Sequence, residues 1–374
     1  MDLLKAPIAA VLLCAAVGCS APQPAPAPES APKAPGGEAS KPDDKTAFAI
    51  VKLDPALDAI VSPDARLETV GDRFGLTEGP VWVRDGAGYL LFSDLLGNVI
   101  YKWTPGGELT AFAENIYDGP DILKVGQQTR RGRLTVIIIG SNGLTLDREG
   151  RLLIASPASR ALKRREKDGT ISIVADRFEG KQFNGPNDVI VKSNGSIYFT
   201  DGNSGLRMGA ASPLRESPEN GFYLVKDGKV TQAGSNKGFK EGFPNGITLS
   251  PDEKHLYVTI GRKIMRYDVK DDDTVTNPTE FADVEGNDGM KVDMNGNLFS
   301  TTGNGPGEVR ITSPEGKRLG SLRLPQPTGE PREQICATNI GWGDADGKGL
   351  YIAACTHVYH IRMNTTGVRP GPES

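Results

Sequence analysis

The chain has 374 residues, of which 43 are Lys or Arg and 47 are Asp or Glu, so its net charge is −4. This near balance gives no basic surface that could hold the phosphates of a nucleic acid, and we exclude that class of partner. The 46 glycines and 27 prolines are typical of short strands joined by tight turns, and no apolar run is long enough to cross a bilayer.

The first 19 residues are typical of a bacterial export signal. Lys5 supplies a positive charge, residues 8–17 form an apolar core, and Ala16-Val17-Gly18-Cys19 resembles the lipobox of lipoproteins. Because the lipobox cysteine is acylated, we predict lipidation at Cys19. Ser20 at the following position favours sorting to the outer membrane, with the protein facing the periplasm. The alternative is an ordinary secretion signal in which Cys19 has no role.

Residues 20–45 are rich in Pro and Ala and cannot bury enough apolar surface to fold. We expect them to form an extended tether between a lipid anchor and a globular body. The predicted organisation is therefore a signal peptide at 1–19, a disordered linker at 20–45 and one folded domain at 46–374. Contact with a membrane is expected only through the anchor.

Six copies of one pattern follow along the chain. Each copy begins with a carboxylate or an amide, continues as a short apolar strand, turns on Asp, Asn or Gly, and returns as a second apolar strand. The copies begin 43 to 64 residues apart with further strand segments between them, which is the signature of propeller blades. The polar residues that begin the copies are Glu78, Asn142, Asn187, Asn245, Asp288 and Asn339.

The sixth copy has no room for a fourth strand after residues 358–362, whereas an extra strand at 66–70 precedes the first copy. We predict that the N-terminal strand completes the last blade, because a closed ring leaves few exposed strand edges. The predicted fold class is all-β, a six-bladed β-propeller whose ring is closed by an N-terminal strand.

Cys336 and Cys355 are the two cysteines outside the signal, and they flank the expected hairpin of the sixth copy. If Gly343 faces Gly349, the cysteines fall one residue from direct opposition, close enough for a disulfide in an oxidising compartment. Two buried thiols are the alternative, because a slip of one residue would send the side chains to opposite faces.

Equivalent positions of propeller blades surround one axis, so the six polar residues should converge on the central channel. Two carboxylates and four amides offer the hard oxygen ligands that Ca²⁺ prefers, and Zn²⁺ or Mg²⁺ are alternative ions. The alternative interpretation is that these side chains only cap the loops that enter each strand.

Four segments, TEGPVW, PNDVIVKSNGSIYFTD, PNGITLSPDEKHLYV and DGMKVDMNGNLF, occur in the order found in one known family. They resemble the gluconolactonase/regucalcin (senescence marker protein) family of six-bladed propellers and, more distantly, paraoxonase-like and diisopropylfluorophosphatase-like propellers. The resemblance spans about residues 66–363 and implies metal ligands at Glu78, Asn245 and Asp288. Asn187 matches a position that binds the metal in some members and substrate or metal-bound water in others.

Three segments depart from this family. Residues 155–158 read ASPA where many bacterial members have a Cys-Glu-His-Gly-like segment, and residues 202–205 read GNSG where Pro-Pro-Tyr-Gly is common. Residues 119–140 are an unusual insertion. All three are expected on loops at the channel mouth, so the resemblance supports the metal ligands more than the substrate pocket.

The sequence contains no Gly-x-Ser-x-Gly and no His-Glu-x-x-His motif, so a serine triad and a zinc protease are not indicated. His357 and His360 lie three apart in a strand and therefore point to opposite faces, which does not suit a pair of metal ligands.

Metal-assisted hydrolysis of a sugar-acid or related lactone is the chemistry that the sequence favours. Asp288 is the candidate catalytic base, and the candidates for binding the lactone are Asn142, Asn187, Asn339 and Asp201, the last with a strand-end turn role as its alternative. Two other functions stay open. One is an organophosphate or aryl-ester hydrolase on the same metal, and the other is a non-catalytic, calcium-stabilised binding propeller.

Overall fold

In the computed structural model, Asp44–Ser374 form one compact unit. The predicted signal, the linker and the lipidation site Cys19 lie outside the residues that the structure describes. In the described part, no helix is long and apolar enough to span a membrane, and the helices present are the short 3₁₀ turns η1 (Pro55–Ala59) and η2 (Gly209–Ala211). The described residues are 47–120, 122–131, 134–239, 242–283, 288–303, 305–329 and 333–372.

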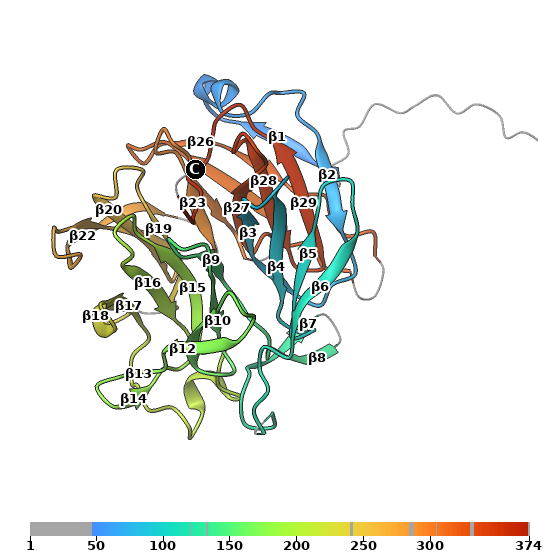
Figure 1. The fold of residues 1–374 in the computed structure, drawn as a ribbon. Helices are drawn as coiled ribbons and strands as arrows, with labels where there is room; N and C mark the ends of the chain where they lie inside the picture. Colours follow the sequence, from blue (N-terminus) through green and yellow to red (C-terminus); the bar gives the residue numbers. More distant parts are fainter. Residues whose placement is uncertain are drawn as a thin grey trace, which may run out of the picture. The chain divides into compact units, whose positions relative to one another are not determined.

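The described strands confirm the six-bladed propeller (Figure 1). In each blade the strand nearest the axis comes first in the copy, and the other strands follow it outward. Blade one has β3 (Thr77–Val83), β4 (Tyr89–Asp94), β5 (Val99–Trp103) and β6 (Leu109–Glu114). Blade two has β9 (Leu144–Leu146), β10 (Leu152–Ser156), β11 (Ala161–Arg165) and β12 (Ile171–Ala175). Blade three has β15 (Pro186–Val191), β16 (Ile197–Asp201), β17 (Gly221–Lys226) and β18 (Lys229–Ser235).

The second half of the ring follows the same plan, with additions in its last two blades. Blade four has β19 (Pro244–Leu249), β20 (His255–Ile260), β21 (Lys263–Val269) and β22 (Val275–Asp283). Blade five has β23 (Met290–Val292), β24 (Leu298–Thr301), β25 (Glu308–Thr312), β26 (Arg318–Arg323) and β1 (Ala49–Lys52). Blade six has β27 (Asn339–Gly343), β28 (Gly349–Ala354), β29 (His357–Arg362) and β2 (Leu67–Gly71). Two small hairpins lie between blades: β7 (Gln128–Arg131) with β8 (Leu134–Ile137), and β13 (Arg177–Phe178) with β14 (Lys181–Gln182).

The repeated Asp/Asn/Gly turns form the hairpins between the two innermost strands. In blades two, three and five the same tight turn is closed by a left-handed glycine: Gly150 at φ 77°, Gly195 at φ 89° and Gly296 at φ 83°. In blade two, for example, Gly150 N donates to Asp147 O at 3.0 Å. A side chain would be strained at these positive φ values, and this explains why glycine recurs at the turn.

The N-terminal strand closes the ring as predicted. β2 pairs antiparallel with β29, with Leu67 opposite Ile361. A second N-terminal strand, β1, which the sequence analysis did not anticipate, pairs with β26 and gives blade five a fifth strand. The N-terminal segment therefore reinforces two neighbouring blades.

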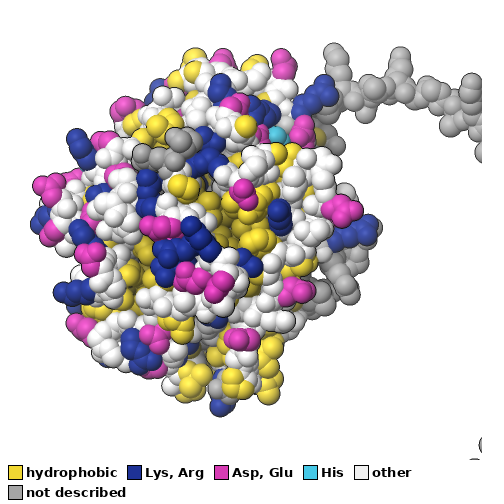
Figure 2. Space-filling view, viewed as in Figure 1, with side chains coloured by type: hydrophobic (Ala, Val, Ile, Leu, Met, Phe, Trp, Pro, Cys, Tyr) yellow, Lys and Arg dark blue, Asp and Glu magenta, His cyan; other side chains and the backbone are white. Residues whose placement is uncertain are grey.

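The hydrophobic core lies between the faces of adjacent blades. Trp82 of blade one stacks on Tyr351 of blade six with ring centroids 5.5 Å apart, and Phe299 of blade five meets Trp342 of blade six edge to face at 5.0 Å. Such contacts bury large aromatic area and fix the angle between blades. On the molecular face drawn in Figure 2, acidic and basic side chains are intermixed, and hydrophobic side chains gather near its middle.

Candidate functional site

The six polar residues that begin the copies lie at the same end of the innermost strands. Glu78, Asn187 and Asn245 are each the second residue of their strand, and Asn339 is the first residue of β27. The remaining two, Asn142 and Asp288, precede their strands by two residues. All except the partly exposed Asp288 are buried. The structure thus brings the whole predicted set to one mouth of the channel.

In four of the six copies, a glycine after the polar residue allows close packing on the next blade. A Cβ added at Gly79 would lie 2.4 Å from Asn142 O, and one added at Gly246 would lie 2.3 Å from Asp288 O. A Cβ at Gly289 would lie 2.1 Å from the side-chain Cγ of Asn339. No side chain fits at such distances, so glycine is required where neighbouring blades approach each other at the axis. This explains the Glu-Gly, Asn-Gly and Asp-Gly pairs of the sequence.

A hydroxyl on the second strand of a blade holds the polar residue of the following blade. Ser93 Oγ donates to Asn142 O at 2.8 Å, and Thr200 Oγ1 donates to Asn245 O at 2.6 Å. Thr259 Oγ1 makes the equivalent bond to Asp288 O at 3.4 Å. The repeated Ser or Thr in the second strands therefore fixes the backbone of the ring and leaves the ring side chains to the channel.

Bulges turn three of these side chains out of the sheet pattern. The pairing of the first strand with the second shifts directly after Glu78 in blade one, and at the same place in blades three and four, after Pro186 and Pro244. Bulges of this kind redirect side chains beside active sites.

Glu78 is a buried acid in a partly balanced environment. Its Oε2 accepts the Gly79 N–H at 3.0 Å, and the Asn339 side chain also donates to it. Burial, followed by the negative charge of Asp188, raises the pKa of Glu78 well above its usual range, although these hydrogen bonds and the charge of Lys291 act in the opposite direction. A bound cation would favour the ionised form of this carboxylate.

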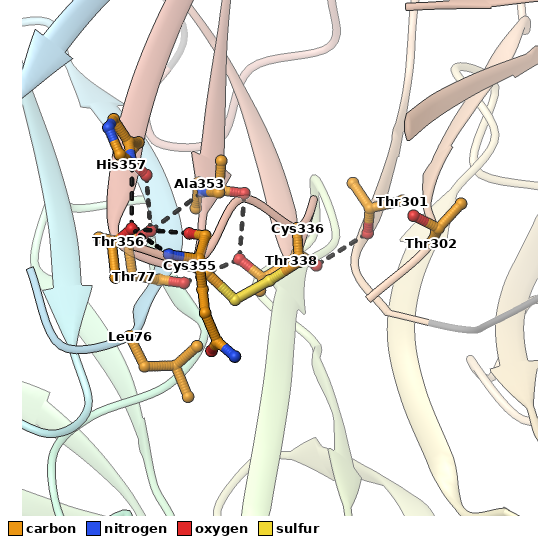
Figure 3. The surroundings of a disulfide bond; sticks show 12 residues. Leu76, Thr77, Thr301, Thr302, Cys336, Thr338, Ala353, Cys355, Thr356 and His357 are labelled. Atoms are coloured by element: carbon orange, nitrogen blue, oxygen red, sulfur yellow. Dashed lines mark hydrogen bonds between the residues drawn. A yellow bond between two sulfur atoms is a disulfide. The ribbon is translucent and has the colours of Figure 1, made fainter. Parts of the chain in front are cut away.

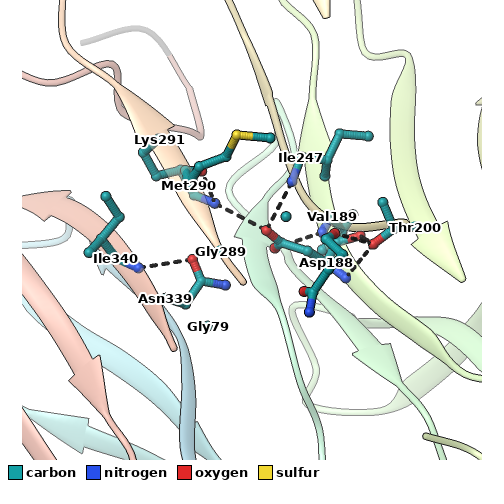
Figure 4. A network of polar contacts seen from close by, with 12 residues as sticks. Gly79, Asp188, Val189, Thr200, Ile247, Gly289, Met290, Lys291, Asn339 and Ile340 are labelled. Atoms are coloured by element: carbon teal, nitrogen blue, oxygen red, sulfur yellow. Dashed lines mark hydrogen bonds and ion pairs between the residues drawn. The ribbon is translucent and has the colours of Figure 1, made fainter. Parts of the chain in front are cut away.

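Asp188 and Lys291 are channel residues that the sequence analysis missed (Figure 4). Asp188 is 1% exposed; its Oδ1 accepts the Val189 N–H at 2.9 Å, and its Oδ2 lies 3.4 Å from Lys291 Nζ. Its Oδ2 also lies 3.5 Å from Ile247 N of the next blade. Two signals could have identified the pair: Asp188 stands where four of the other five copies have glycine, and Lys291 interrupts an apolar strand.

The amides of the ring differ in their contacts. Asn142 is buried, and its Oδ1 has no hydrogen-bond partner among the residues that the structure describes. An unsatisfied buried acceptor is costly and indicates a site for a ligand group or a cation. In contrast, Asn339 Oδ1 accepts the N–H of Ile340 at 2.9 Å, so this side chain also caps its own strand.

Asp201, a candidate for substrate binding, has the strand-end role instead. Its side chain is fully buried and accepts the backbone N–H groups of Asn184 at 2.9 Å and Gly185 at 2.6 Å. Asp94 ends the equivalent strand of blade one and accepts Gly75 N at 2.9 Å in the same way. Burial raises the pKa of Asp201 to about 7. The Asp201 carboxylate therefore holds the backbone of the loop that leads to Asn187.

A disulfide joins Cys336 to Cys355, with their Cα atoms 5.4 Å apart (Figure 3). Gly343 faces Gly349 in the hairpin between them, as the register argument assumed. Cys355 O accepts the N–H of Thr77 at 2.7 Å, and Thr77 immediately precedes Glu78. The disulfide therefore anchors the backbone that leads into the ring.

The three segments that depart from the family pattern contact one another. The insertion bonds to the loop after β16 through Gly126 N and Gly205 O at 2.9 Å and through Gln127 N and Ser204 O at 2.7 Å. A Cβ added at Gly205 would lie 2.2 Å from Pro157 O of the third segment. These loops follow strand ends on the ring side of the propeller, so together they shape one side of its mouth.

The donor set of the ring is rich in oxygen and poor in charge. In the part of the chain that the structure describes, no three His, Cys, Asp or Glu side chains lie together as candidate metal ligands. A cation at the ring would be held by two carboxylates together with amide oxygens. This set, with the unpartnered Asn142 Oδ1 and the buried Glu78, fits a hard divalent cation.

Comparisons with known proteins agree with this geometry. The family model described as "SMP-30/Gluconolactonase/LRE-like region" matches residues 76–356. A gluconolactonase of Zymomonas mobilis is 32% identical over 336 residues, which cover 85% of this chain and 87% of that protein. The solved gluconolactonase of Xanthomonas campestris is 25% identical, with a TM-score of 0.66, covering 86% of this chain and 98% of that one. A calcium-binding regucalcin of Agrobacterium tumefaciens, at 17% identity and a TM-score of 0.61 over 83% of this chain and 98% of that one, shares the fold.

Proposed function

Because the chain belongs to the SMP-30/gluconolactonase/LRE-like family, we propose that it is a lactonase that hydrolyses a sugar-acid or related lactone. The observation that carries the proposal is the ring at the channel mouth, where Glu78, Asn245 and Asp288 lie at equivalent positions of their blades. A chain that had kept only the scaffold would not need polar side chains at these positions, two of which are buried.

We propose further that Glu78, Asn187, Asn245 and Asp288 hold a divalent cation, with Ca²⁺ preferred and Zn²⁺ or Mg²⁺ as alternatives. When bound, such an ion supplies Lewis-acid polarisation of the ester carbonyl and acidifies nearby water. The burial of Glu78 close to the charge of Asp188 supports the proposal, because Lys291 offsets the repulsion between these two buried acids only in part.

We propose that side chains of the ring carry out the other steps of lactone hydrolysis. Asp288 is partly exposed at the mouth. We propose that it takes a proton from the attacking water while the oxygen of that water bonds to the lactone carbonyl carbon. The bond between that carbon and the ring oxygen then breaks, and the ring oxygen receives a proton. Asn142, with its unpartnered Oδ1, and the amides of Asn187 and Asn339 are proposed to orient the hydroxyls of the lactone.

An assay of purified protein against sugar-acid lactones, aryl esters and organophosphates, with and without a chelator, tests the proposal. We expect lactone turnover that a chelator abolishes, and loss of both turnover and calorimetric Ca²⁺ binding in Glu78→Gln and Asp288→Ala. Asp268→Asn, which alters an acid on the exposed side of β21, is the matched control. Turnover of aryl esters or organophosphates without lactones would favour the related hydrolase, and Ca²⁺ binding without any turnover would favour a binding propeller.

We also propose that the protein is exported and anchored through Cys19 to the outer membrane, facing the periplasm. The support is the lipobox-like segment before Cys19 and the Pro/Ala-rich linker after it. Labelled fatty acid should be incorporated into the wild type and not into Cys19→Ala, and processing should be sensitive to globomycin. A purified chain that begins at another residue and carries no lipid would contradict this proposal.

A further inference from the structure

A second site lies at the opposite mouth of the channel from the ring. A cavity of about 830 Å³ is lined there by residues at or beyond the far ends of the innermost strands, including Arg84 after β3, Arg148 after β9 and Leu249 at the end of β19. Its volume is that of a pocket for a small molecule. Lys291 also lines it, and the ion pair of Lys291 with Asp188 lies between this cavity and the ring.

The C-terminal segment forms one wall of this cavity. After β29 the chain pairs with blade five, where Val368 N donates to Val292 O at 3.2 Å, and then reaches blades one and two. There Arg148 Nη1 donates to Gly371 O at 2.9 Å, and Arg84 donates to Pro372 O. The segment brings Arg369 to the same cavity as Arg84 and Arg148.

The three arginines make the wall strongly cationic. Among the residues that the structure describes, neither Arg84 nor Arg369 forms an ion pair with a carboxylate. Arg84 donates to Pro372 O of the C-terminal segment, and Arg369 donates to Asp344 O at 3.1 Å and to Ala345 O at 3.3 Å. Burial and the charges of Arg369 and Arg148 lower the pKa of Arg84. The guanidinium groups of Arg84 and Arg369, which donate to neutral carbonyl oxygens beside the positive charge of Arg148, are arranged as in sites for carboxylates.

The facing wall offers hydroxyls and acids that already have partners. Thr145 and Thr248 also line the cavity. Glu253 is held by Ser193, whose N and Oγ donate to it at 2.6 and 2.5 Å, and Asp252 accepts Ser250 Oγ at 2.6 Å. This side therefore suits the hydroxyl groups of a ligand and disfavours a second negative group.

We propose that the cavity binds a small hydroxylated carboxylate, with its carboxylate at Arg84, Arg148 and Arg369 and its hydroxyls towards Thr145 and Thr248. Lactone hydrolysis yields a compound of this class, so the choice of a hydroxy acid rests on the proposed function, whereas the anion site rests on the cavity alone. The protein would thus bind its own product at a place remote from the ring.

Calorimetric titration with sodium gluconate tests the site, with the uncharged polyol sorbitol and inorganic phosphate as comparison ligands. Wild type and Glu78→Gln should bind gluconate with similar affinity, and Arg84→Gln/Arg369→Gln should bind at least about tenfold more weakly, the cost of one lost charge-assisted bond. Arg84→Lys, which keeps the charge, should retain most of the affinity. Because binding is measured without turnover, a failure of the lactonase assay leaves this result interpretable.

A second measurement needs no variant and so does not depend on folding of the double mutant. Gluconate should protect Arg84, Arg148 and Arg369 of the wild type from phenylglyoxal, as read by peptide mass spectrometry. The proposal is overturned by unprotected arginines, by equal affinity in the double arginine variant, by loss of binding in Glu78→Gln, or by a preference for sorbitol or phosphate over gluconate.

Discussion

Removal of the disulfide should lower the stability of the propeller by an amount set by its loop. The bond joins residues 19 positions apart, and cross-linking a loop of this length restricts the unfolded chain by about 3 kcal/mol. With an unfolding entropy of about 2.1 cal/mol/K per residue over a unit of about 330 residues, the melting temperature should fall by about 4 °C. The double variant Cys336→Ala/Cys355→Ala produces this change without leaving a free thiol.

Thermal unfolding followed by circular dichroism, with and without dithiothreitol, measures the effect. The wild type should lose about 4 °C under reduction, and the double variant should melt at the same temperature in both buffers. Since Cys355 O accepts Thr77 N beside Glu78, we also expect the variant to lose lactone turnover below its melting range. A wild type that melts identically in both buffers would show that the cross-link does not contribute.

Two further substitutions test the closing blade and the ring. His360 lies 3.1 Å from Asp344 Oδ2 and 3.2 Å from Glu68 Oε2 of the closing strand, and these acids raise its pKa against the opposing effect of burial. His360 therefore stabilises the fold fully below the ordinary histidine pKa of 6.5, and this stabilisation is lost as the pH rises through the higher pKa of the folded state. Urea titrations at several pH values should show this dependence of the free energy of unfolding on pH, and His360→Asn should remove it. In Gly289→Ala the new Cβ would lie 2.1 Å from Cγ of Asn339, which should abolish turnover and lower the melting temperature in a thermal scan.

Matched variants separate these effects from general damage. His255→Asn alters a more exposed histidine outside the closing blade and should keep the pH dependence that is attributed to His360. Gly107→Ala adds a Cβ at 3.3 Å from Thr104 in an exposed turn and should keep turnover and melting temperature. An equal loss in Gly107→Ala and Gly289→Ala would show that close packing at the ring is not the cause.

The features that the sequence predicted are those that repeat. Glycine turns, paired apolar strands and a polar residue at the start of each copy are local patterns, and six copies placed the residues from Glu78 to Asn339 in one register before any contact was known. The closing role of the strand near Leu67 followed from a count of strands, because the sixth copy was one short.

The features that the sequence did not predict depend on contacts between distant segments. β1 is a short segment, and its partner β26 lies far along the chain, with Ala49 opposite Arg323. No local sequence pattern specifies such a distant partner. Asp188 gains its importance from Lys291 of another blade and from the charge of Glu78. For Asp201, the sequence leaves two interpretations open, substrate binding and a strand-end turn role. Its contacts with the backbone N–H groups of Asn184 and Gly185 favour the second one.

Closure by the N-terminal strand also governs when the chain can finish folding. Glu68 of β2 and His360 of β29 contact each other across 292 residues of sequence. During synthesis β2 waits with an open edge until almost the entire chain has emerged, and loop-closure entropy opposes the pairing until the intervening blades are in place. Closure of the ring must therefore wait for β29, and until it occurs β2 and β29 present unpaired strand edges to every other chain nearby.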